Sequence, residues 1–125
     1  MRAPLLLLPL LLLAAVPAAA DEFVAGTEDV PLMPGLRPLP NSEMVFDKPE
    51  GRIVEARAAG TTTRTKVEAF YAASLPPLGW KAAGRDAWER DAERLTLDFA
   101  GPGSKLAVGF TISPHERMPG NGKTE

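Results

Sequence analysis

The chain has 125 residues, of which 14 are lysine or arginine and 16 are aspartate or glutamate, so its net charge is −2. This length supports one small domain with a single core. The weakly acidic and mixed charge offers no basic surface for nucleic acid, and the absence of cysteine excludes disulfides, thiol catalysis and thiolate metal sites.

Residues 1–20 have the features of a secretory signal peptide. Arg2 precedes a leucine-rich run over 5–13, and Ala18 and Ala20 place small residues at the −3 and −1 positions of a cut after Ala20. The apolar run is about half the roughly 20 residues that a spanning helix needs. We therefore expect cleavage, no stable membrane insertion afterwards, and a periplasmic or secreted protein.

Residues 21–42 are predicted to form an extended, proline-rich arm, because four prolines remove backbone donors and favour extended conformations. The arm has more apolar side chains than a solvated linker needs, so we expect it to lie along a surface. Whether that surface belongs to the domain or to a partner stays open. The apolar side chains of the arm are Val30, Leu32, Met33, Leu36 and Leu39.

Residues 43–113 are predicted to form a single α+β domain. It begins with a hairpin of Met44–Phe46 and Arg52–Ala58, the second strand having one apolar face. A capping box of Thr65 and Glu68 predicts the start of a helix, which Pro76 ends. The predicted apolar stripe of this helix consists of Val67, Phe70, Tyr71, Ser74 and Leu75.

Turn residues divide the remainder into four short predicted strands. The last two alternate apolar and polar residues, which is typical of a sheet with one buried face. We therefore expect a small antiparallel sheet with one helix packed on its apolar face, followed by a disordered tail over 114–125. The four strands are Trp80–Ala83, Ala87–Arg90, Arg94–Ala100 and Lys105–Ser113.

The helix and the strand after it carry the pattern V-x-x-F-Y-x-x-x-L-x-x-L-G-W, formed by Val67, Phe70, Tyr71, Leu75, Leu78, Gly79 and Trp80. With its proline-containing lead, the chain resembles a loosely defined group of small exported bacterial domains. The resemblance covers roughly residues 29–113. It implies a fold and a compartment, and brings no activity or catalytic residues with it.

The carboxylates and the histidine are the residues to weigh for chemistry. Asp47, Glu55 and Asp98 would serve as an acid and base only if they converged, and the pattern places them in a turn and on polar strand faces. His115 is the only histidine and lies in the predicted tail. We therefore predict no catalytic residue, no metal site and no cofactor.

The interpretation that fits these observations is a non-enzymatic exported module that binds a protein or another cell-envelope component. The alternative is a carrier of a lipid or other apolar ligand between helix and sheet, against Phe70, Leu97, Phe99 and Phe110. A carboxylate-dependent hydrolase is the third reading. The predicted interaction surface consists of Trp88, Leu32, Met33 and Leu36.

Overall fold

The computed structural model describes residue 4, residues 22–101 and residues 105–115. The predicted signal peptide, apart from residue 4, and most of the predicted tail lie outside the described residues. The elements in chain order are β1 (Arg37–Pro38), β2 (Met44–Lys48), β3 (Gly51–Thr61), α1 (Arg64–Ser74), the 3₁₀ helix η1 (Pro76–Leu78), β4 (Lys81–Ala82), β5 (Ala87–Arg90), β6 (Glu93–Ala100) and β7 (Lys105–Pro114).

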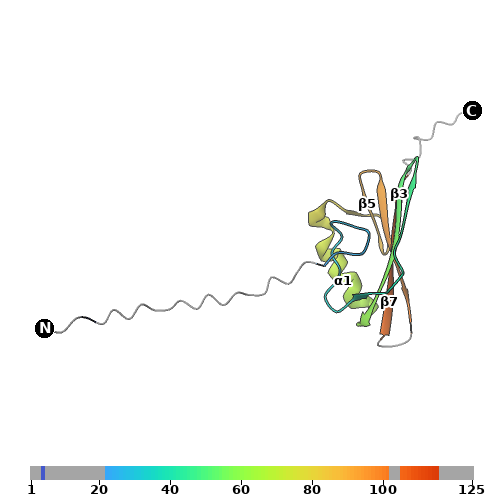
Figure 1. Cartoon of the computed structure of the whole chain (residues 1–125). Coiled ribbons are helices and arrows are strands. Elements are labelled where there is room, and N and C mark those ends of the chain that lie inside the picture. Colours follow the sequence, from blue (N-terminus) through green and yellow to red (C-terminus); the bar gives the residue numbers. More distant parts are fainter. Residues whose placement is uncertain (1–3, 5–21, 102–104, 116–125) are drawn as a thin grey trace, which may run out of the picture.

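The strands form one antiparallel sheet in the order β1-β3-β7-β6-β5-β4, and β2 also pairs with β3. The chain crosses from β3 to the opposite edge of the sheet through α1 and η1. It then returns strand by strand until β7 pairs with β3. Figure 1 shows α1 and the blue N-terminal segment on the same side of the sheet.

The prediction of an α+β fold with an antiparallel sheet and one α-helix is confirmed. In β3, Val54, Ala56 and Ala58 are buried, whereas Glu55 and Arg57 are exposed. Strands β6 and β7 likewise direct their alternating apolar residues into the core, so the apolar face of the sheet packs against the helix.

The helix begins two residues earlier than a cap at Thr65 requires. Thr63 is the N-cap, with φ −119° and ψ 155°, and its Oγ1 accepts a hydrogen bond of 3.2 Å from the N–H of Lys66. Because Lys66 occupies the third helical position, the predicted capping box is wrong. Glu68 instead lies 3.6 Å from Arg64 and 3.4 Å from Arg85, measured between side-chain nitrogen and oxygen.

The core extends beyond the predicted domain boundary at residue 43. Val24, Val30, Leu32 and Leu36 belong to the same buried cluster as the helix face and the inner sheet face. Residues 22–36 therefore supply core side chains.

The predicted boundary at 114 is also displaced. Pro114 pairs with Glu93 at the end of β7, and the N–H of His115 donates a hydrogen bond of 2.6 Å to the carbonyl of Ala92. These two residues continue the sheet and are not part of a tail.

Candidate interaction groove

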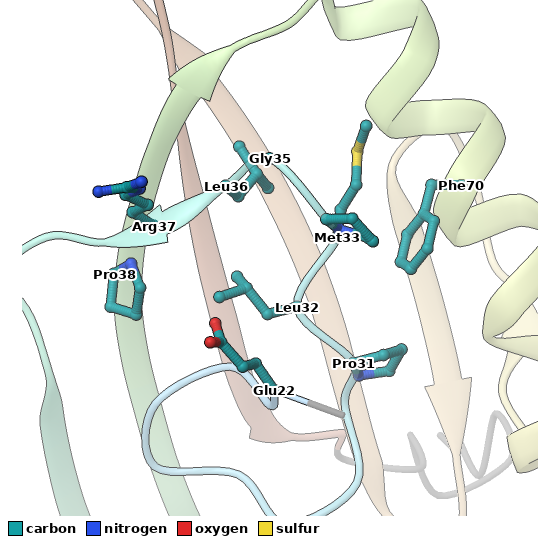
Figure 2. A pocket seen from close by; sticks show the side chains of 10 residues that line it. Glu22, Pro31, Leu32, Met33, Gly35, Leu36, Arg37, Pro38 and Phe70 are labelled. Carbon is teal, nitrogen blue, oxygen red and sulfur yellow. The ribbon is translucent and has the colours of Figure 1, made fainter. Parts of the chain in front are cut away.

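An open groove of about 860 Å³ lies where the N-terminal segment crosses the helix side of the sheet. Its lining consists of Glu22, every residue from Pro31 to Pro38, and Phe70 of α1. We call this feature the groove. In Figure 2, Phe70 faces Met33 on one side, while Glu22 and Arg37 lie toward the other. The groove thus has an apolar side and a charged margin.

Leu32 and Leu36 form the buried base of the groove, with exposed fractions of 6% and 3%. Met33 and Phe70 are half-buried and pack against the same core. The exposed parts of Met33 and Phe70 are therefore the apolar surface that a binding partner can contact, since Leu32 and Leu36 are already buried in the core.

Tyr71 ties the wall of the groove to the helix and the sheet. Its side chain is fully buried, and its hydroxyl donates a hydrogen bond of 2.8 Å to the carbonyl of Pro31 and accepts one of 3.2 Å from the N–H of Met33. Its ring meets Phe70 edge-on at a centroid distance of 4.9 Å, and Phe110 of β7 at 5.6 Å. The Tyr71 side chain therefore connects helix α1, the N-terminal segment at Pro31 and Met33, and strand β7.

The turn at Pro34 and Gly35 rests directly on the backbone of β3. A Cβ added to Gly60 would lie 2.2 Å from the carbonyl oxygen of Gly35, so this close approach requires glycine at position 60. The N–H of Leu36 donates a hydrogen bond of 3.0 Å to the carbonyl of Met33, which closes the turn. The groove wall is thus held from below as well as from the helix.

The start of the segment is held by strand β5, toward the other edge of the sheet. The N–H of Leu32 donates to the carbonyl of Glu22 at 2.7 Å, which forms the base of a loop over residues 22–32. Asp29 in this loop pairs with Arg90 of β5, and the guanidinium of Arg90 lies 4.3 Å from the ring centroid of Trp80.

The stability of the protein is expected to fall in alkaline solution because of Tyr71. Burial raises the pKa of Tyr71 well above its ordinary value of 10.0. The unfolded chain therefore loses this proton first, so the stabilisation is complete below pH 10 and is lost above it, at about 1.4 kcal/mol per pH unit. Denaturant unfolding at increasing pH measures this fall.

Tyr71→Phe is the matched control, and it should remove that part of the pH dependence. Tyr71 is also the only tyrosine, so the ultraviolet absorbance of tyrosinate reports this residue alone. Ionisation of Tyr71 at its ordinary pKa while the protein stays folded would contradict the burial of its hydroxyl.

The structure brings together three of the four predicted interaction residues. Leu32, Met33 and Leu36 all line the groove, although only Met33 leaves much of its side chain accessible. Trp88 lies elsewhere, on β5, with an exposed fraction of 6%. It faces the core beside Leu95 of β6, so Trp88 is not part of an exposed interaction surface.

Sequence reasoning missed Glu22, Arg37 and Phe70 as lining residues of the groove. The predicted stripe placed Phe70 in the core, whereas the structure leaves it half-buried at the groove. The signal that was present is the Pro34-Gly35 turn between apolar residues, which marks a reversal within the predicted arm.

The carboxylates considered for chemistry do not all meet. Glu55 and Asp98 line a second pocket of about 310 Å³ on the outer face of the sheet, and both are exposed. Asp47 pairs with Arg52, whose side of the strand is opposite to that of Glu55. The three side chains therefore lie on two different faces.

His115 Nε2 lies 3.4 Å from Glu89 Oε1. Among the described residues there is no group of three or more histidine, aspartate or glutamate side chains placed to hold a metal ion. No helix within residues 22–101 and 105–115 is long and apolar enough to cross a membrane.

Comparison with protein-family models, with curated proteins and with solved structures found no match.

Proposed function

We propose that this protein is a non-enzymatic exported module that binds an extended apolar segment of a cell-envelope protein in the groove. The observation that carries the proposal is the groove itself, an open apolar surface built around Met33 and Phe70. Export is proposed from the signal-peptide pattern of residues 1–20 and agrees with the resemblance to small exported domains.

The form of the groove favours an extended segment over an enclosed small molecule. Its walls are a stretch of chain containing Pro31, Pro34 and Pro38, whose restricted backbones lose little entropy when a partner binds. Grooves of this kind accept extended peptides through apolar contact along their length. The charged margin of Glu22 and Arg37 would then favour one direction of the bound segment.

The carrier reading receives less support from the packing. A carrier would hold its ligand between helix and sheet, where the rings of Tyr71 and Phe110 are already in contact. Phe110 and Leu97 are buried in that core. Native mass spectrometry of the protein purified from its own cells would detect a retained lipid, and such a finding would favour the carrier.

A photoreactive amino acid placed at position 33 tests the proposal in living cells. We expect it to cross-link to an apolar segment of one envelope protein, because Met33 lines the groove. The same amino acid at position 78 is the matched control, since Leu78 is an exposed apolar residue of η1 with no part in the groove lining. The cross-linked peptide is identified by mass spectrometry.

Charge substitution supplies the second half of the test. Met33→Glu should abolish the cross-link made from a probe at position 70, whereas Leu78→Glu should leave it unchanged. Leu78→Glu should keep the melting temperature, because Leu78 is exposed. Met33→Glu should stay folded by circular dichroism, because Met33 is only half-buried. Equal cross-linking from positions 33 and 78, or binding that survives Met33→Glu, would show that the groove is not the binding site.

A further inference from the structure

Strand β2 lies at an edge of the sheet and exposes an unusual amount of apolar surface. Met44, Val45 and Phe46 have exposed fractions of 46%, 48% and 48%. On one side β2 pairs with β3, and among the described strands none pairs with its other side. An edge strand with exposed apolar side chains on both faces is a template for pairing with another strand.

The outward backbone groups of β2 can be assigned from the ladder. Arg57 of β3 directs its N–H and carbonyl toward this edge, because its N–H donates to Ser42 Oγ and its carbonyl accepts from the N–H of Leu39. In an antiparallel ladder this direction alternates, so Glu55 and Ile53 face β2, and they bond to Met44 and Phe46. Val45 and Asp47 therefore present their own N–H and carbonyl groups outward.

We infer that β2 is a self-association edge, on which a second copy of this chain adds its own β2 antiparallel. The two-fold axis of such a dimer stands perpendicular to the sheet, so residues that oppose each other lie on the same face. Registers centred on Val45, Phe46 or Asp47 satisfy this condition with at least three residues of each β2 paired. The last of these places Asp47 opposite Asp47 of the second copy, where like charges repel, so two registers remain. In one, Val45 opposes Val45 of the second copy, and in the other Phe46 opposes Phe46 of the second copy.

Charge decides between the two registers. The first places Glu43 directly opposite Asp47 of the second copy, twice, and like charges in opposing positions destabilise a sheet. The second pairs Met44 with Lys48, whose aliphatic stem lies well against an apolar neighbour, and pairs the outward backbone groups of Val45 and Asp47. Asp47 keeps Arg52 opposite it on β3. The second register is therefore the one we infer, with the two Phe46 rings meeting at the centre.

The other edge of the sheet explains why the association stops at two copies. Strand β4 has two residues, and one of them is Lys81. A short edge strand with a lysine discourages further pairing. An isologous contact through β2 therefore closes on itself and does not grow into a fibre.

The absence of cysteine makes single-cysteine cross-linking a direct test. In the inferred register position 46 faces itself across a pair without hydrogen bonds, where Cα atoms lie about 4.5 Å apart, within reach of a disulfide. Phe46→Cys should therefore give a disulfide dimer under mild oxidation. Leu78→Cys, at a similarly exposed apolar position far from the edge, should stay monomeric.

Two further variants separate the edge from other modes of association. Val45→Pro removes a backbone N–H that points outward from β2 and leaves the hydrogen bonds between β2 and β3 intact. Phe46→Lys places two like charges at the centre of the dimer. Sedimentation should show loss of the dimer in both variants.

Cross-linking through Val45→Cys in place of Phe46→Cys would overturn the register. A wild-type protein that stays monomeric at high concentration, or a dimer that persists in Phe46→Lys, would overturn the inference. Cross-linking to the envelope protein from position 33 should be unchanged in Phe46→Lys, so the two proposals fail separately.

Discussion

Replacement of Tyr71 by alanine is expected to lower the free energy of unfolding by about 3–5 kcal/mol, the range for truncating a buried aromatic side chain. The ring is fully buried and meets both Phe70 and Phe110. Its removal also leaves the N–H of Met33 and the carbonyl of Pro31 without their partner. Denaturant unfolding followed by circular dichroism measures the loss.

Two variants divide this effect into its parts. Tyr71→Phe keeps the ring and removes the hydroxyl, so it should cost about 1–3 kcal/mol from the unpaired backbone groups. Phe70→Ala should cost clearly less than Tyr71→Ala, because Phe70 is only half-buried. A larger loss in Phe70→Ala would mean that the helix is rotated relative to the sheet, with Phe70 as its main core residue.

The sheet was predictable because its strands obey a period of two. In β7, Leu106, Val108, Phe110 and Ile112 alternate with small or polar residues, and all four are buried. The bounds of β5 at Ala87 and Arg90 follow from the turn residues on both sides. Local patterns were sufficient here, since the alternation and the turn chemistry act within a few residues.

Two predictions that failed concern the residue that caps the helix and the direction of the Trp88 side chain. Thr63 and Thr65 are both good caps, and the extended backbone at Thr63 selects the first. Trp88 lies between charged residues in the sequence, yet its face of β5 points at the core because Leu95 on β6 does so. The direction of Trp88 is set by the pairing of β5 with β6, which the local sequence pattern does not contain.

The sequence identifies apolar residues of the groove but does not show how they are arranged in space. Leu32, Met33 and Leu36 have no regular period, since prolines interrupt them. Their positions are fixed by contacts with distant parts of the chain, namely the Tyr71 hydroxyl and the glycine at position 60. Because these contacts link residues far apart in the sequence, the direction of each side chain could be obtained only from the fold.

A chain that begins at Arg37 is expected to lose cooperative folding. It lacks Val24, Val30, Leu32 and Leu36, which are all buried in the main core. Full burial of such side chains stabilises a protein by about 1.5–3 kcal/mol each, before the entropy of ordering the segment is subtracted. A small domain has a total stability of about 5–15 kcal/mol, so the loss of all four removes most of it.

A chain that begins at Glu22 is the matched control, because it keeps every described core residue, and it should melt cooperatively in calorimetry. Gly60→Ala in the chain that begins at Glu22 then tests whether stability depends on where residues 22–36 dock and not only on which side chains they carry. It retains all four apolar residues but forces the Gly35 carbonyl away from β3. If docking against β3 places the segment in the core, Gly60→Ala must lower the melting temperature and weaken cross-linking from position 33. Cooperative melting of the chain that begins at Arg37, at the same temperature as its control, would show that the segment only covers a core already complete without it.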